Sequence, residues 1–190
     1  MIAASDGHGG DMNDTETTLG AARATYWQVN QFGDDGGDSL KSVPIKLWKL
    51  TLQVPNTDGR RRAVKIHDLH HVLTGYATTW TGEAEIAAWE LASGCFRWPA
   101  ATVLNLGALG VGLWIAPLRV ARAWSRGRQT KNLYGEDAVD HLLPRKVEEV
   151  RTTLGLDRAE VRTRIRDVAL LAALTLVPIA AVAVIIHALV

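Results

Sequence analysis

The chain has 190 residues, which is enough for one ordinary domain and a little more. Its 21 basic and 20 acidic residues leave a formal net charge of +1, so no global electrostatic argument favours nucleic acid as a partner. The only cysteine is Cys95, which excludes an intramolecular disulfide framework and any zinc site built from several cysteines.

The N-terminal third predicts a disordered leader, a helix and an extended segment. Residues 1–18 are rich in Gly, Asp and Thr and lack the basic-then-apolar order of a secretory signal, so we expect a disordered leader. A helix is expected from about Leu19 to Asn30, and the acidic GDDGGDS segment then predicts a turn. VPIKLWKLTLQVP alternates apolar and polar residues, which predicts a short strand or an extended segment on the core. PNTDGR predicts another turn.

Two helices are predicted in the middle of the chain. The first runs from Ala63 to Leu73 and ends near Gly75, a suitable C-cap. Thr81 can cap the second helix, which carries several apolar residues and ends at Ser93-Gly94. Because the loop between the two helices is short, we expect them to form an antiparallel hairpin.

Two long apolar stretches follow, from Trp98 to Val120 and from Val168 to Val190. A helix needs roughly 20 apolar residues to span a bilayer, so both stretches are long enough. Asn105 is the only strongly polar interruption of the first stretch before Arg119, and we interpret that stretch as a buried or membrane-surface helix. Four arginines precede the second stretch: Arg158, Arg162, Arg164 and Arg166.

The second stretch carries no charge, and its basic flank is typical of a membrane anchor whose preceding domain lies on the cytoplasmic side. We therefore predict a C-terminal membrane helix over 167–190, with a buried core helix or a self-association helix as the alternatives. Between the two stretches, a helix is expected to begin near Pro144 and to place three apolar residues on one face: Val147, Val150 and Leu154. Together the elements predict an all-α protein whose helical domain covers 19–166.

Three of the six histidines lie within the five residues HDLHH. At about 100° per residue, His67, Asp68 and His71 fall within an arc of about 100° on one helix face. His67 and His71 are four residues apart, the spacing that the zinc metalloprotease helix uses. Glu83 stands at the start of the following helix, where a hairpin can bring it opposite His71.

These residues predict a metal site, with a solvated helix that carries surface histidines as the alternative. The expected ligands are two imidazoles and two carboxylates: His67, Asp68, His71 and Glu83. This set suits zinc, iron or manganese and leaves a position for water or substrate. An ion there can polarise a carboxyl group or activate water. His70, at the border of the cluster, and Glu90, seven residues after Glu83, are candidates for orienting the ligands.

The motif H-D-x-x-H, followed by eleven residues and a glutamate, resembles the signature of the coenzyme Q biosynthesis protein four family. The flanking segments are also similar to that family: HVLTG after the histidines, GEAEIAAWE through the glutamate, APLR at Ala116 to Arg119, and PRKVEEVRTTLGL near Pro144. The resemblance covers roughly Arg61 to Leu156 and is densest near the histidines.

The resemblance implies a mostly helical protein at a membrane surface that takes part in ubiquinone biosynthesis. It implies a divalent metal, usually described as zinc, on His67, Asp68, His71 and Glu83. The family is linked to replacing the ring carboxyl of a polyprenylated hydroxybenzoate with hydroxyl, and to organising other biosynthetic proteins. The expected partners are therefore membrane lipids, a polyprenylated aromatic substrate, and other quinone-biosynthesis proteins or further copies of this chain. A C-terminal apolar helix departs from the family's peripheral members.

The residues near the motif suggest how such a substrate is held. The apolar, glycine-rich stretch from Trp98 to Val120 can line a groove for the tail, with ordinary core packing as the alternative. Arg61 and Arg62 can approach a carboxylate or an anionic lipid, although a solvated turn is the simpler interpretation.

Whether the protein is an enzyme stays open at this point. The main alternative is a non-catalytic membrane scaffold or lipid-binding protein with a structural metal. Four protein ligands would favour this alternative, whereas three protein ligands and a water would favour catalysis. HDLHH also matches the H-x-x-H-H box of membrane di-iron hydroxylases, but those enzymes need several boxes. An HD-type phosphohydrolase needs a further upstream histidine. The remaining histidines do not supply these groups: His8, His141 and His187.

Overall fold

The computed structural model describes residues 16–47, 50–136, 138–157 and 163–173. This part of the chain is mostly helical, as the sequence predicted, with one small hairpin of strands. Residues 165–173 are also helical. The elements are α1 (Leu19–Val29), β1 (Ser42–Leu47), β2 (Leu50–Pro55), α2 (Asp58–Thr74), α3 (Trp80–Ser93), α4 (Pro99–Ile115), α5 (Pro117–Gly127), the 3-10 helix η1 (Asp140–Leu142) and α6 (Val147–Leu154).

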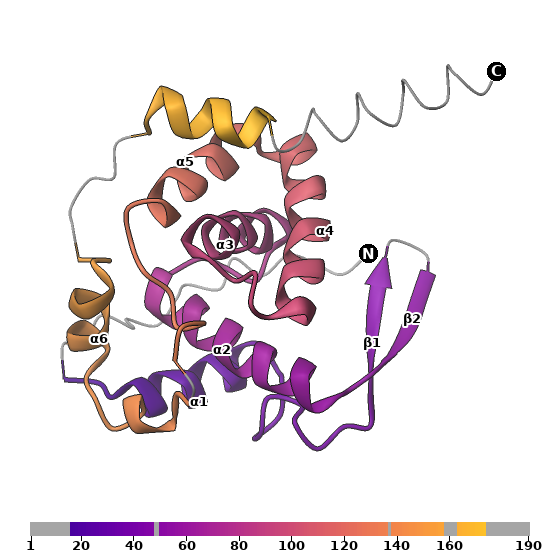
Figure 1. Cartoon of the computed structure of the whole chain (residues 1–190). Helices are drawn as coiled ribbons and strands as arrows, with labels where there is room; N and C mark the ends of the chain where they lie inside the picture. Colours follow the sequence, from indigo (N-terminus) through magenta and orange to yellow (C-terminus); the bar gives the residue numbers. More distant parts are fainter. Residues whose placement is uncertain (1–15, 48–49, 137, 158–162, 174–190) are drawn as a thin grey trace.

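Helix α3 forms the centre of the fold. Figure 1 shows it nearly end-on, with α2, α4 and α5 around it. Every residue from 84 to 92 is buried, as expected for a helix that is apolar on nearly all faces. Two of these buried residues are Glu85 and Glu90, whose carboxylates need partners in this environment.

Helix α2 begins earlier than the sequence predicted. The side-chain oxygen of Thr57 accepts a hydrogen bond from the backbone N–H of Arg60, so the helix starts at Asp58. The prediction of a turn over PNTDGR was therefore wrong from Asp58 onward, because the threonine cap stabilises helical backbone through the glycine. The other end follows the prediction: Gly75 adopts the left-handed conformation, with a φ of 76°.

Helix α3 is capped by Thr79 rather than by Thr81, since the Thr79 hydroxyl oxygen accepts from the N–H of Gly82 at 3.2 Å. The helix ends at Ser93, and Gly94 is left-handed as predicted. The prediction that these two helices, α2 and α3, form an antiparallel hairpin was wrong. In Figure 1, α2 lies across the view while α3 is seen nearly end-on, so the two helices cross steeply. The reason is that α3 is apolar all round and packs into α4 and α5 instead of lying along α2.

The apolar stretch from Trp98 to Val120 is not one helix. Helix α4 ends at Ile115 and α5 begins at Pro117, with the non-helical residue Ala116 between them, whose φ is −152° and ψ is 55°. Proline lacks an N–H and disfavours helical backbone in the residue before it, so the chain bends here. Within the described residues, no helix combines the length and apolar character that crossing a membrane needs.

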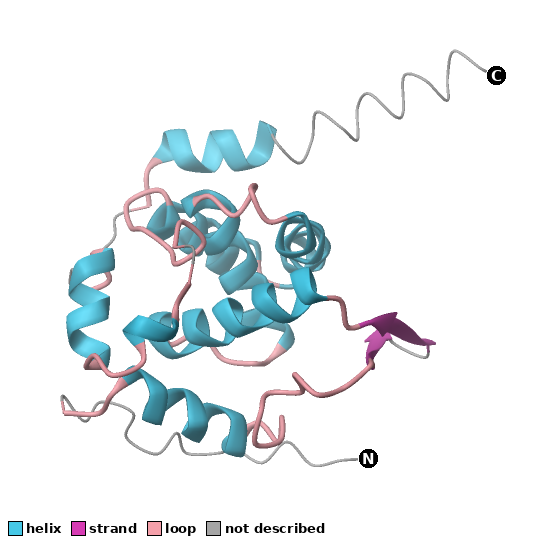
Figure 2. Cartoon of the chain, turned by 60° about the horizontal axis from the view of Figure 1, so that its bottom comes forward, coloured by secondary structure: helices cyan, strands magenta, loops and turns pink. Residues whose placement is uncertain are grey.

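The segment expected as a short strand or as an extended segment on the core folds back on itself. Strands β1 and β2 pair antiparallel, from Ser42 with Pro55 to Leu47 with Leu50. Figure 2 shows the hairpin projecting from the helical body. The alternation of apolar and polar residues predicted extended backbone correctly, but it gave no sign of the turn. Helix α1 confirms the predicted first helix.

The remaining predictions concern the chain after α5 and the two termini. Helix α6 starts at Val147, slightly later than predicted. Its buried residues are the three predicted ones: Val147, Val150 and Leu154. Most of the predicted leader (1–15) and most of the predicted C-terminal helix (174–190) lie outside the described residues.

The close packing of Gly82 against the loop between α2 and α3 can be tested by substitution. A Cβ at this position would lie 1.9 Å from the carbonyl oxygen of Ala77, a backbone atom that cannot rotate away. We expect Gly82→Ala to lower the free energy of unfolding by about 1–3 kcal/mol, as overpacking does, in denaturant titrations. Gly107→Ala is the control, because a Cβ there meets nothing within 4 Å and alanine favours helix. Equal stability of the two variants would contradict the packing argument.

Candidate metal centre

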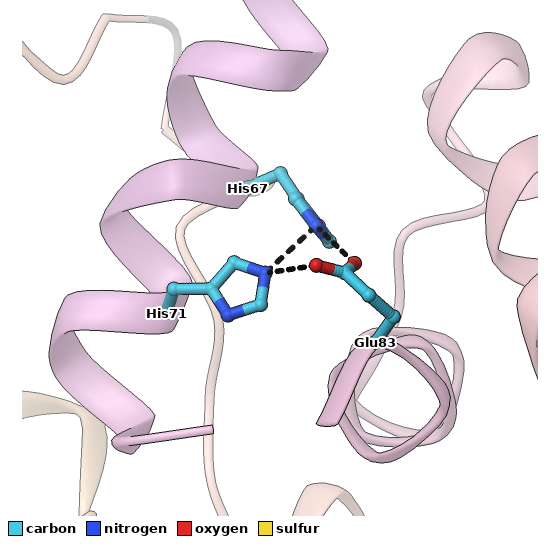
Figure 3. Close-up of side chains that lie close together, drawn as sticks. All are labelled: His67, His71 and Glu83. Atoms are coloured by element: carbon cyan, nitrogen blue, oxygen red, sulfur yellow. Dashed lines mark hydrogen bonds and ion pairs between the residues drawn. The ribbon is translucent and has the colours of Figure 1, made fainter. Parts of the chain in front are cut away.

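Three of the four predicted ligands converge between α2 and α3. In Figure 3, the rings of His67 and His71 extend from α2 toward Glu83 on α3. The two Nε2 atoms are 3.1 Å apart, and each lies 3.4 Å from an oxygen of Glu83. Two ligand atoms of a tetrahedral zinc ion, each at about 2.1 Å, lie about 3.4 Å apart. The spacing therefore suits a single ion, and it makes His67, His71 and Glu83 the candidate site.

Hydrogen bonds at the far nitrogens determine which atoms of the two rings face the site. Nδ1 of His71 lies 2.8 Å from the carbonyl oxygen of Tyr76, which can only accept, so Nδ1 carries the hydrogen and Nε2 a lone pair. Nδ1 of His67 lies 3.0 Å from a carboxylate oxygen of Glu90, which favours the same tautomer of the neutral ring. When both rings are neutral, their two Nε2 lone pairs therefore face each other and the Glu83 carboxylate. A positive charge among the three groups, either a proton or a metal ion, relieves the repulsion between them.

The electrostatics of the site agree with this conclusion. Burial acts to raise the pKa of Glu83, but hydrogen bonds and charge from His67 and His71 outweigh it and lower the pKa to about 2. Burial acts to lower the pKa of His67, yet Glu90 and Glu83 raise it well above its ordinary value. The site thus attracts positive charge, either a proton on His67 or a metal ion that displaces it.

The carboxylate of Glu90 lies behind His67 and is fully buried. One of its oxygens is 3.0 Å from Nδ1 of His67 and 2.6 Å from Nδ1 of His70. The other accepts from the amide of Asn105 at 2.5 Å and from the hydroxyl of Tyr134 at 3.0 Å. Burial acts to raise the pKa of Glu90, but the two histidines lower it below its ordinary value. Metal-binding histidines commonly donate to such a carboxylate, which fixes the ring orientation.

His70 does not face the candidate site. Its Nε2 accepts from the backbone N–H of Leu133 at 2.9 Å, so its Nδ1 carries the hydrogen that is donated to Glu90. Burial lowers the pKa of His70, which agrees with a neutral ring. The residue therefore holds Glu90 in place and connects α2 to the chain after α5.

Asp68, the fourth predicted ligand, lines the same cleft but does not join the cluster of the other three. Its carboxylate accepts from the indole Nε1 of Trp27 at 2.8 Å, and it is not in the cluster of ligand atoms found among the described residues. Asp68 stands about 100° around α2 from His67, on the side where α1 packs. The same helix supplies Tyr26, whose ring stacks on His71 with centroids 5.4 Å apart. The predicted ligand-bearing face of α2 was thus too wide, because α1 covers the part that carries Asp68.

Asn105 and Tyr134 were not predicted as site residues. Asn105 left a signal in the sequence, since a single amide in an apolar stretch indicates a buried polar partner. Tyr134 left no such signal, because the loop that carries it reaches Glu90 only through long-range packing.

Two clefts open beside the candidate site and share Arg60, Val64, His67 and Glu83. The first has a volume of about 390 Å³ and lies between α1, α2 and the loop before β1. Charged groups contribute to its lining: Asp35, Asp38, Arg61, Lys65 and Asp68. The second has a volume of about 320 Å³ and lies between α2 and α4. Apolar side chains contribute to its lining: Ala63, Trp80, Ala101, Leu104 and Ala108.

The contact between Glu90 and His67 can be tested by metal affinity. Replacing Glu90 with Gln keeps the shape but removes the charge that orients His67 Nδ1. Loss of such a carboxylate typically weakens metal binding about 10–100-fold, so we expect that range in a competition titration with a chelating dye. Glu85→Gln is the control, because this buried carboxylate of the same helix pairs with Arg119 at 2.6 Å. Equal affinities in the two variants would refute the orienting role.

No model of a known protein family matches this chain, and no curated protein matches it either. The likeness to the coenzyme Q biosynthesis protein four family therefore rests on the motif and its flanking segments alone.

Proposed function

We propose that this protein is a metal-dependent, membrane-associated protein of ubiquinone or related prenylated-quinone biosynthesis. The observation that carries the proposal is the convergence of three groups, His67, His71 and Glu83, which all present electron pairs to one point. They are also three of the four residues that the family resemblance marks as ligands. The reaction that fits is replacement of the ring carboxyl of a polyprenyl-hydroxybenzoate with hydroxyl.

Three protein ligands favour a catalytic metal over a structural one. With Asp68 bonded to Trp27, a fourth coordination position is available to water or to a substrate oxygen. A bound ion supplies Lewis acidity there, while Glu90 and Tyr76 hold the two imidazoles in orientation. Exchanging a carboxyl for a hydroxyl releases carbon dioxide and removes two electrons. The reaction therefore needs a two-electron oxidant from outside the chain. Iron or manganese in the site would be able to exchange electrons with that oxidant, whereas zinc would supply Lewis acidity only.

The two clefts suit an amphiphilic aromatic substrate. The apolar cleft between α2 and α4 offers Ala101, Leu104 and Ala108 to a prenyl tail, as expected for the stretch that starts at Trp98. The cleft beside α1 offers polar and charged groups to the ring and its substituents. Since the clefts share His67 and Glu83, a molecule that fills both brings its ring to the candidate metal.

Helix α4 supports membrane association. It lies at an outer edge of the helical body (Figure 1), and Trp114 at its end is 88% exposed. Several large apolar side chains exposed together on one helix mark a contact surface. Arg97 and Arg122 are exposed before and after it, as expected beside anionic lipid headgroups. Leu104 belongs both to this face and to the apolar cleft, so a tail can pass between them. The other large exposed apolar residues of α4 are Val103, Leu106, Val111 and Ile115, and the exposed Leu118 follows on α5.

We place this surface on the cytoplasmic side of the membrane, as the arginines before the C-terminal apolar stretch predict. The partners in the proposal are membrane lipids, the prenylated aromatic substrate, and other proteins of the pathway or further copies of the chain.

The alternative is a scaffold whose metal is structural. Asp68 favours it, because this carboxylate lines the same cleft as the other three ligands and completes a four-ligand set if it exchanges Trp27 for the ion. Cobalt substitution distinguishes the two. An absorption spectrum that changes with added anions indicates an open position, and an unresponsive tetrahedral spectrum indicates four protein ligands.

Metal content is the direct test of the site. We expect about one divalent ion per chain in purified protein, and loss of most of it in His67→Ala and Glu83→Ala, because each removes one of three ligands. Elemental analysis of the purified variants measures this. His141→Ala is the control, since His141 is exposed and lies outside the cluster. Unchanged metal content in the two site variants would eliminate the site.

The pathway assignment is tested in the host strain. Deleting the gene should lower quinone levels and accumulate a carboxylated prenyl-phenol, because the carboxyl is the group that the proposed step removes. Extracted lipids can be analysed by mass spectrometry, with the wild-type gene and His141→Ala as complementing controls. Normal quinone levels without the accumulated precursor would reject the biosynthetic role.

The membrane face can be tested at Trp114. A polarity-sensitive dye on Trp114→Cys should shift to shorter emission wavelengths when anionic vesicles are added, because the apolar face enters the lipid. Cys95 is buried, so the dye reacts at the new cysteine. Val29→Cys is the control, since Val29 is 73% exposed on α1, away from α4. The same dye response at both positions would refute a specific role of α4.

A further inference from the structure

Arg60 occupies the junction of the two clefts. It lines both of them, together with Val64, His67 and Glu83. Arg60, Val64 and His67 are spaced by four and then three residues, which places them in one stripe on α2. The guanidinium therefore belongs to the same surface as the candidate ligands, about 10 Å along the helix from His67 at the backbone.

The guanidinium of Arg60 has no anionic partner among the described residues. Its Nη1 donates to the neutral amide oxygen of Asn56 at 2.9 Å, and its buried Nε has no hydrogen-bond partner in the described part of the chain. Burial lowers the pKa of Arg60, and no charged neighbour counteracts this. The side chain stays charged all the same, because arginine does not lose its proton in proteins.

The neighbouring cations differ from Arg60 in this respect. Lys65 pairs with Asp38 at 3.0 Å. Arg61 contacts both Asp38 and Asp58. Their charges are neutralised within the protein. A partly buried guanidinium whose Nε is shielded from water gains from binding an anion. Among the described residues that line these clefts, Arg60 is therefore the arginine or lysine that remains available to a ligand.

We propose that Arg60 is the specificity-determining residue that binds the anionic head, a ring carboxylate, of an amphiphile whose tail occupies the apolar cleft. This inference rests on the proposed function, which supplies the carboxylate-bearing ring. A guanidinium binds a carboxylate through two parallel N–H donors, which fixes the plane of the group as well as its charge. Arg60 thereby selects the carboxylated precursor over the product, from which the carboxyl is gone.

The test uses two probes that share a tail and differ only in the carboxyl: 3-geranyl-4-hydroxybenzoate and 2-geranylphenol. Dissociation constants are measured by calorimetry on full-length protein treated with a chelator, so that the metal does not contribute. We expect wild-type protein to prefer the carboxylate. Arg60→Gln should weaken carboxylate binding about ten- to a hundredfold, as loss of a charged hydrogen bond does, and change 2-geranylphenol binding less than twofold.

Two further variants make the result specific. Arg60→Lys should recover part of the preference, because it restores the charge without the paired donors. Arg62→Gln should behave as wild type, since Arg62 is exposed and lines neither cleft. Equal weakening of both probes in Arg60→Gln, or no binding of either probe to wild-type protein, would overturn the inference. Inorganic phosphate that displaces the carboxylate probe at equal concentration would also overturn it, in favour of a phosphate site.

This result can be separated from failure of the proposed function. Normal metal content and a quinone defect in the deletion strain, together with an Arg60→Gln variant that binds both probes as wild type does, would refute only the role of Arg60. Absence of metal with a carboxylate preference that depends on Arg60 would refute the metal-dependent function and leave the binding role standing.

Discussion

The buried carboxylate of Glu90 is the interaction on which the candidate site depends. It accepts from His67 and His70 on α2, from Asn105 on α4 and from Tyr134 after α5, and it belongs to the central helix α3 itself. A buried charge is costly to desolvate, and these contacts offset that cost. The same contacts hold four parts of the chain in register around one point.

The orientation of the candidate ligands follows from this network. Glu90 holds the hydrogen of His67 on Nδ1, and the carbonyl of Tyr76 does the same for His71, so both Nε2 lone pairs face Glu83. Such preorganisation favours a cation, because the three groups repel one another without it. Close packing at Gly82 contributes too, since it brings the first turn of α3 against the loop that follows α2.

Charged and apolar side chains lie on different sides of the candidate site. One cleft beside it carries charged groups, the other is largely apolar, and α4 has an apolar face turned outward. An apolar stretch that was expected as a single helix thus contributes to three environments. Its buried residues contact α3, other residues line the tail cleft, and Trp114 with its neighbours forms the proposed membrane surface. The break at Ala116 allows α5 to return along α3.

Local spacing in the sequence determined which residues share a helix face. It predicted the common face of His67 and His71, the start of α3 near Glu83 and the end of that helix at Gly94, because the backbone geometry of a helix depends only on its own residues. Tertiary structure alone decided that α1 covers Asp68, that Asn105 and Tyr134 meet Glu90, and that Arg60 has no acidic partner within the described part of the chain. Each of these depends on segments far apart in the chain, and helical periodicity carries no information about which segments pack together.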